Sequence, residues 1–291
     1  MSTFDSPAVP VGLPAGARAA TPDSPAAPLR RVAPVWHTLV LLAFIFLMSF
    51  HGSSAVSSAA AGKHTNFLYV QTIAIQWLLF AYVVWGLRKG GVRLRDLIGG
   101  RWNSPEEFLL DFAIAVGFML TAFVVLGGLN LVATTVPCFL DRAHHGLPVF
   151  ANGGIKAALE CALRGRSSNA SRLVNFLGPK TGLQLLLGMC VSATAGVVEE
   201  TMFRGYLQRQ FGAWTNRAWL GLICSAMVFG LAHGYEGPST MFVIFVFGAM
   251  FGAVAMWRNS LRPGMMTHAM FDAVEMLVLF LFSSGAVKMP S

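Results

Sequence analysis

Charged side chains are scarce in this chain. Only 12% of its 291 residues are Asp, Glu, Lys or Arg, whereas 55% are hydrophobic, and the mean hydropathy is +0.61. A soluble domain carries about 25% charged residues, so half that share indicates that most of the surface faces lipid. This scarcity excludes an ordinary soluble protein of one or two domains.

Paired cysteine motifs are also missing. The four cysteines, Cys138, Cys161, Cys190 and Cys224, form no CxxC pair, which excludes a zinc knuckle and a disulfide-based scaffold. Cys190 and Cys224 lie in apolar runs, where a buried cysteine acts as a small hydrophobic side chain. Cys138 and Cys161 can pair only if their loop lies outside the cytoplasm.

The sequence has no basic face of the kind that binds nucleic acid. Lys and Arg outnumber Asp and Glu by 21 to 13, but the basic residues stand between apolar runs. In membrane proteins, basic loops of this kind stay in the cytoplasm. We therefore expect the lipid bilayer as a partner, and no nucleic acid.

Long apolar runs are abundant, and a membrane-spanning helix needs about 20 mostly apolar residues. Seven segments reach or approach this length: 35–50 (extending toward 56), 67–87, 108–140, 181–211, 217–233, 238–257 and 263–282. We expect an all-α, polytopic transmembrane bundle of about seven to eight spans, with an eighth if the polar stretch 142–180 contributes one. The third run is long enough to tilt or to bend near Gly127 and Gly128.

Three regions differ in composition. Residues 1–34 are rich in Pro, Ala and Ser and predict a disordered tail. Residues 35–180 hold the first three spans and a connection whose segment 155–163 has an amphipathic pattern, predicted to lie at the interface. Residues 181–285 hold the remaining spans and the ionisable residues within them.

Basic residues predict the orientation of the bundle. They follow the second, fourth and sixth spans, and alternation places these three loops on one side. The positive-inside rule makes that side cytoplasmic, together with the N-terminus. The 142–180 loop is discordant, because it falls outside and yet carries Arg164, Arg166, Arg172 and Lys180.

Ionisable residues inside the apolar spans are concentrated after residue 195, where they mark a functional site because they are costly in a membrane. Glu200 and Arg204 are four residues apart with the acid first, which favours an ion pair on one helix face. Glu199 then lies about 100° around the helix without a local partner. An unpaired glutamate in an apolar setting is suited to proton transfer.

Two more groups follow on separate spans. His268 and Asp272 are four residues apart, so they face the same way. Phe229 lies one turn before His233 and is placed to wall a pocket. The other histidines are interpreted as loop or interface residues without a role; they are His37, His51, His64, His144 and His145.

Three motifs in this order resemble the CPBP family of intramembrane proteases, which includes the eukaryotic CAAX prenyl endopeptidases and bacterial Abi-type proteins. The family pattern is Glu-Glu-x-x-x-Arg, then Phe-x-x-x-His, then His-x-x-x-(Asn or Asp). It occurs here at 199–204, 229–233 and 268–272. The resemblance says little about residues 1–180. It implies endoproteolysis of a peptide or protein substrate, membrane-associated or not, by a multi-pass protein of the bacterial cell membrane.

The resemblance also implies roles at the matching positions. Glu199 and His233 would position and deprotonate a water molecule, with Glu200 and Arg204 as structural support. The remaining pair, His268 and Asp272, would stabilise the oxyanion or orient the water. An ionised aspartate cannot donate to an oxyanion, so Asp272 orienting His268 or holding a metal are alternatives.

Two mechanisms stay open. Glu199, His233 and His268 form a Glu/His/His set of the kind that binds zinc, and zinc lowers the pKa of bound water toward about 7. The alternative, which we slightly favour, uses no metal and makes Glu199 itself the base. No His-Glu-x-x-His motif occurs, so an ordinary zincin is excluded.

Straight helices place these side chains at conflicting depths. At about 1.5 Å per residue, Glu199 lies about 20 Å from the predicted cytoplasmic turn, His233 about 27 Å and His268 about 9 Å. The three meet only if helices tilt, break at Gly205 or re-enter the bilayer at Gly234–Gly237.

Two other functions compete with a protease. A non-catalytic relative acting as an immunity or scaffold protein would tolerate loss of a site residue, yet Glu199, His233, His268 and Asp272 are all present. A transporter or proton channel would show repeated halves and polar residues strung across the bilayer, and neither pattern occurs.

Overall fold

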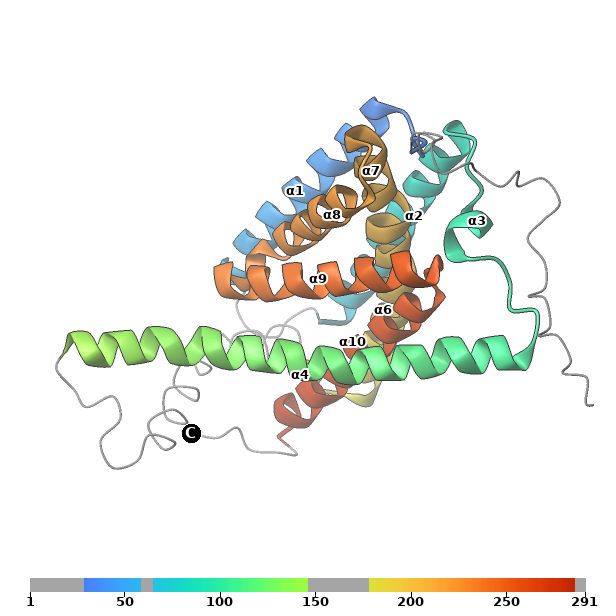
Figure 1. The fold of residues 1–291 in the computed structure, drawn as a ribbon. Helices are drawn as coiled ribbons and strands as arrows, with labels where there is room; N and C mark the ends of the chain where they lie inside the picture. Colours follow the sequence, from blue (N-terminus) through green and yellow to red (C-terminus); the bar gives the residue numbers. More distant parts are fainter. Residues whose placement is uncertain (1–28, 59–64, 146–177, 286–291) are drawn as a thin grey trace, which may run out of the picture.

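The computed structural model describes residues 29–58, 65–145 and 178–285, and throughout these ranges the secondary structure is helical, without a strand. Figure 1 shows the arrangement. The helices are α1 (Val35–Ser58), α2 (Thr65–Lys89), α3 (Leu94–Ile98), α4 (Pro105–His144), α6 (Gly182–Glu199), the π-helix η1 (Glu200–Leu207), α7 (Gln208–Thr215), α8 (Ala218–Ala232), the 3-10 turn η2 (Gly234–Glu236), α9 (Pro238–Arg258) and α10 (Arg262–Ser283).

All seven predicted spans are apolar helices. Five are long and apolar enough to cross a membrane: Asn66–Lys89, Pro105–Asp141, Gly182–Thr215, Pro238–Arg258 and Arg262–Ser283. The apolar helices Val35–Phe50 and Ala218–Ala232 are shorter. The predicted tail up to residue 28 and the interfacial segment 155–163 lie outside the described residues, as does most of the stretch that would hold an eighth span.

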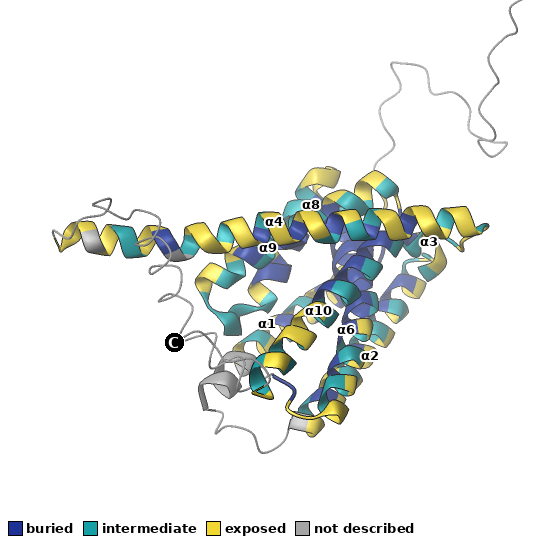
Figure 2. Ribbon diagram, turned by 90° about the horizontal axis from the view of Figure 1, so that it is seen from below, coloured by how far each residue is buried: buried dark blue, intermediate teal, exposed yellow. Residues whose placement is uncertain are grey.

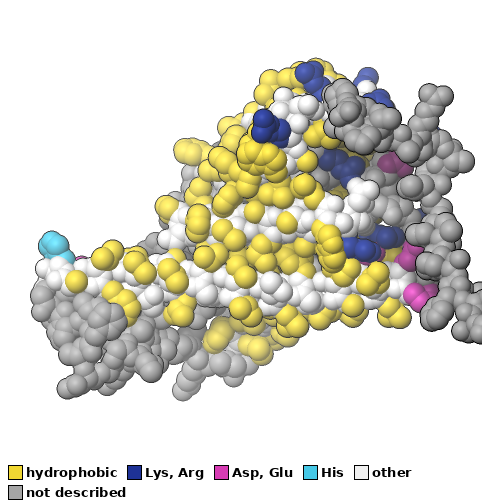
Figure 3. Space-filling model, in the orientation of Figure 1, with side chains coloured by type: hydrophobic (Ala, Val, Ile, Leu, Met, Phe, Trp, Pro, Cys, Tyr) yellow, Lys and Arg dark blue, Asp and Glu magenta, His cyan; other side chains and the backbone are white. Residues whose placement is uncertain are grey.

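Large apolar side chains cover much of the outer surface. Leu78 is 70% exposed, Val124 76% and Trp257 70%, and apolar atoms dominate the face shown in Figure 3. Buried residues gather instead where α6, η1, α8 and α9 meet (Figure 2). In water such a surface would be unfavourable, whereas in a bilayer it contacts lipid tails. The fold is that of a multi-pass membrane protein.

Helix α4 is one unbroken helix of 40 residues. It runs straight past Gly127 and Gly128 and extends beyond the other helices (Figure 1), so the bend allowed by the sequence is absent. At about 1.5 Å per residue it is roughly 60 Å long, twice the thickness of a hydrocarbon core. Cys138 in this helix is disulfide-bonded, whereas Cys190 and Cys224 are free; Cys161 lies outside the described residues.

His37 is a core residue, which corrects its interpretation as an interface residue. Its side chain is fully buried in α1, with Nδ1 2.7 Å from the Tyr206 hydroxyl and Nε2 3.0 Å from the Tyr82 carbonyl oxygen. The imidazole also stacks on the Tyr82 ring at 3.9 Å. Its partners lie 45 and 169 residues away, so local spacing carries no signal for this contact.

A buried ionic cluster joins the start of α4 to the link between α9 and α10. Asp111 is fully buried; its Oδ1 accepts from Arg258 Nη2 at 2.9 Å and its Oδ2 from Trp102 Nε1 at 3.0 Å. Arg262 Nε lies 2.8 Å from the same Oδ2, with its guanidinium over the Trp102 ring. We call these four residues the Asp111 cluster. It fixes α4 against α9 and α10.

Candidate active site

The helix that carries Glu199 and Glu200 changes its winding between them. Glu199 ends α6, and the next eight residues, Glu200–Leu207, form the π-helix η1, all of them buried. π-Helical segments are rare and occur frequently at functional sites. The chain continues through Gly205 into α7, so the break considered there does not occur. The α-helical winding expected for 200–207 was therefore wrong.

The Glu200–Arg204 ion pair predicted from spacing is present. Arg204 Nη1 donates to Glu200 Oε1 at 2.8 Å, and both side chains are about 1% exposed. Arg204 Nη2 also donates to the Gly248 carbonyl oxygen at 3.1 Å, and the guanidinium lies 4.4 Å from the centre of the Phe229 ring. Each charge is thereby compensated within the apolar core.

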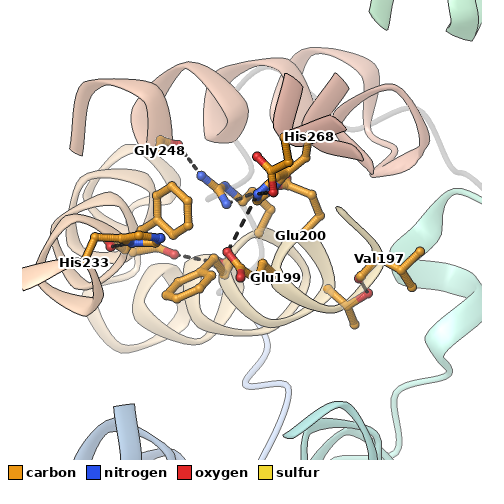
Figure 4. Close-up of polar contacts among 12 residues, drawn as sticks. Val197, Glu199, Glu200, His233, Gly248 and His268 are labelled. Atoms are coloured by element: carbon orange, nitrogen blue, oxygen red, sulfur yellow. Dashed lines mark hydrogen bonds and ion pairs between the residues drawn. The ribbon is translucent and has the colours of Figure 1, made fainter. Parts of the chain in front are cut away.

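Glu200 has a second partner that the sequence did not reveal. Its Oε1 lies 3.0 Å from His268 Nδ1, so one carboxylate oxygen bonds both the imidazole and the Arg204 guanidinium. Since a carboxylate only accepts hydrogen bonds, Nδ1 carries the proton. The Nε2 atom of His268 then points toward Glu199 Oε2, at 3.8 Å, and Asp272 Oδ2, at 3.6 Å. Figure 4 shows Glu199 facing this histidine.

His233 approaches from the end of α8. Its Nδ1 lies 2.9 Å from the Phe229 carbonyl oxygen, which can only accept, so Nδ1 is the donor and Nε2 of the neutral ring is an acceptor. The Phe229 ring packs edge-on against both histidines, with centroids 5.0 Å from His233 and 6.1 Å from His268. Phe229 therefore walls the site, as its position one turn before His233 suggested.

Counting along straight helices placed Glu199, His233 and His268 at different depths, but the folded protein brings them to one region. Glu199 and His268 face each other, and the Phe229 ring contacts both His233 and His268, although these residues come from three helices. At Gly196, a Cβ would lie 2.6 Å from the Met265 carbonyl oxygen. This glycine lets α6 and α10 approach closely enough for their side chains to meet.

Three further side chains belong to this site and were missed. Tyr235 and Glu236 are neighbours in η2, and the Tyr235 ring lies 5.9 Å from that of His233. Burial raises the pKa of Glu236, while His233 acts in the opposite direction. Glu275 lies on α10, the helix that carries Asp272. Its position three residues after Asp272, within an apolar helix, was the available signal.

Within the described ranges, no three His, Cys, Asp or Glu side chains are grouped so as to hold a metal ion. Glu199, His233 and His268, the set considered for zinc, do not converge on one point in this arrangement.

The fold and this cluster define a multi-pass membrane protein with a Glu/His/Asp site among its helices. Residues 181–274 match the family model described as type II CAAX prenyl endopeptidase Rce1-like, consistent with a CPBP-family intramembrane protease. The matched segment contains every site residue expected from the sequence motifs. No curated protein and no solved structure gives a significant match. At the family level, the match supports a CAAX-type intramembrane protease.

Proposed function

We propose that this protein is an intramembrane endopeptidase in which Glu199 and His233 activate a water molecule for hydrolysis of a peptide bond. The proposal rests on one observation: two adjacent glutamates differ in burial and in hydrogen bonding. Glu200 is buried and bonded to Arg204 and His268. Glu199 is 20% exposed and accepts no hydrogen bond from the described part of the chain. It is the carboxylate left available to a water molecule.

The proposed reaction uses the Glu199 carboxylate and the Nε2 atoms of His233 and His268. A water molecule between Glu199 and His233 Nε2 loses a proton to Glu199, and its oxygen attacks the scissile carbonyl carbon. When doubly protonated, His268 donates from Nε2 to the developing oxyanion. The proton on Glu199 then passes to the leaving amine as the C–N bond breaks, which yields a free carboxylate and a free amine.

The supporting residues keep this geometry. Glu200 holds His268 through Nδ1, and Arg204 compensates the charge of Glu200. Asp272, 3.6 Å from His268 Nε2, orients that ring and does not donate to the oxyanion. The substrate is a peptide or protein.

The test is peptide cleavage by the purified protein in detergent. A fluorogenic peptide library is incubated with wild type, Glu199→Gln and His233→Gln, with the exposed Glu106→Gln on α4 as a matched control. Loss of a general base lowers the rate by about 10²–10⁴, so the first two variants should lose activity and the control should keep it. Bound zinc is measured in the same samples.

Two results would count against the proposal. If Glu199→Gln and His233→Gln cleave as fast as wild type, these residues take no part in the chemistry. If wild type cleaves no peptide in the library while it is folded and monodisperse, a non-catalytic relative becomes the better interpretation.

A further inference from the structure

A cavity of about 350 Å³ lies between the ends of α7, α8 and α9 and the segment that precedes α1. Its wall includes the apolar side chains of Val92, Met256 and Leu261, and it reaches inward to the buried Arg204. Neither the catalytic carboxylates nor the histidines of the candidate active site line it. The cavity is therefore a separate feature, with a size in the lower range of small-molecule sites.

Two arginines in this cavity have no acidic partner among the described residues. Arg30 Nη2 donates to the Gly90 carbonyl oxygen at 3.2 Å, and Arg209 Nη2 lies 3.5 Å from that of Leu97. Neither forms an ion pair with an Asp or Glu of the described residues, whereas Arg204 is paired with Glu200. A guanidinium has five N–H donors, so most donors of Arg30 and Arg209 are left for a ligand. The cavity is thus suited to an anion.

The position of the cavity indicates which anion. Lys and Arg side chains gather at the end of the molecule where α3 and α7 lie (Figure 3), the end predicted to be cytoplasmic. Basic pockets between transmembrane helices on this side bind anionic lipid head groups. A lipid phosphate would meet the two arginines, and its glycerol carbons would lie against the apolar wall. A free phosphate has no carbon atoms that could contact that apolar wall.

We propose that this cavity binds the phosphate of an anionic phospholipid, with Arg30 and Arg209 donating to the phosphate oxygens. Asn259 also lines the cavity, and its side-chain amide would bond a head-group hydroxyl. This binding site is independent of the proposed proteolysis. Lipid bound there would hold the bundle at the head-group layer, next to the buried Arg204.

The experiment is a binding titration on the full chain in a neutral detergent, read by native mass spectrometry and by thermal unfolding. The probes are phosphatidylglycerol, phosphatidylcholine and inorganic phosphate. We expect saturable binding and a raised Tm with phosphatidylglycerol alone. Loss of charge-assisted hydrogen bonds should make Arg30→Gln/Arg209→Gln bind about tenfold more weakly.

A charge-matched control separates a site from a basic surface. Arg88→Gln/Arg95→Gln removes the same charge from exposed residues of the same end that do not line the cavity, and it should bind as wild type does. If the double variant at the cavity does not fold, Arg30→Gln alone, at an exposed position, should still weaken binding by about threefold.

Three outcomes would overturn the proposal. Equal weakening by the control pair would assign the binding to diffuse surface charge. Equal binding of phosphatidylcholine would assign it to the acyl chains. Saturation by inorganic phosphate that blocks the lipid would assign the cavity to a free anion.

Discussion

Two buried ionic clusters hold helices together in this protein, and they differ in how completely their carboxylates are used. In the Asp111 cluster, both carboxylate oxygens have partners: Arg258 on Oδ1, Arg262 and Trp102 on Oδ2. In the candidate site, Glu200 Oε1 receives both Arg204 and His268. Its other oxygen, Oε2, is buried and has no hydrogen-bond partner in the described structure.

The candidate site has more carboxylates than cations, which distinguishes it from the Asp111 cluster. Around His268 lie Glu199 and Asp272, whose side chains are 20% and 27% exposed, in addition to Glu200. The Asp111 cluster instead has two guanidiniums for one buried aspartate. A cluster that only joins helices is stable when both oxygens of its buried carboxylate have partners. Unmatched acceptors beside a histidine are what a hydrolytic site needs, because water and substrate supply the missing partners.

The strongest test of this contrast is Glu200→Gln. The amide cannot compensate Arg204, and breaking a buried ion pair costs about 3–5 kcal/mol of unfolding free energy. It also weakens the hold on His268, so kcat should fall by at least about tenfold with little change in KM. Thermal unfolding and peptide cleavage at a temperature where the variant is folded measure the two effects. A purely structural role would lower stability and leave kcat and its pH profile unchanged.

Asp111→Asn is the matched variant of the other cluster. It leaves Arg258 and Arg262 without their carboxylate, and it should lose a similar amount of stability, about 3–5 kcal/mol. Its kcat per folded molecule should stay near that of wild type. If Asp111→Asn slows catalysis as much as Glu200→Gln, the two clusters are not functionally distinct and the comparison fails.

A smaller effect is expected from Gly196→Ala. The new methyl group would meet the Met265 carbonyl oxygen and Ala269, which forces α6 and α10 apart at a cost of about 1–3 kcal/mol. Cleavage should slow as well, because Glu199 and Glu200 follow directly in the chain and must reach His268 on α10. The control is Gly128→Ala in α4, where a Cβ meets nothing within 4 Å. There alanine should stabilise the helix by about 0.5–1 kcal/mol, and equal losses in both variants would refute the packing argument.

Features that depend on local spacing were predictable, and those that depend on distant contacts were not. Apolar length alone located the helical segments of the seven predicted spans, and spacing of four residues predicted Glu200 beside Arg204 and His268 beside Asp272. Local spacing gives no signal for the bonds of Asp111, because its arginine partners lie about 150 residues further on. Nothing in the spacing predicts which distant residues a helix crossing brings together.

The site itself was predicted as a set of residues but not as an arrangement. Its members follow from ionisable side chains in apolar helices, whereas the bond from Glu200 to His268 needs the close approach of α6 and α10 at Gly196. Counting along straight helices put Glu199 and His268 at different depths, since the count assumes parallel axes and regular α-helical winding. The π-helix η1 and the crossing helices invalidate both assumptions.

The smallest expected effect belongs to Phe229→Leu, which removes the aromatic face beneath Arg204 and the wall between the two histidines. A desolvated cation–π contact contributes about 2 kcal/mol, and leucine keeps part of the apolar contact, so stability should fall by about 1–2 kcal/mol and kcat by less than tenfold. Phe242→Leu, on the lipid-facing side of α9 and 56% exposed, should change stability by no more than about 0.5 kcal/mol. Thermal unfolding of both variants in the same detergent measures the difference.

Each variant loses the same atoms. Equal losses of stability would therefore mean that aromatic area stabilises the bundle wherever it lies, and that Phe229 does not stabilise Arg204. A loss of stability confined to Phe229→Leu would instead show that the ring belongs to the ionic network of the site. Phe229 would then be the uncharged partner that lets the Arg204 guanidinium stay buried beside a single carboxylate.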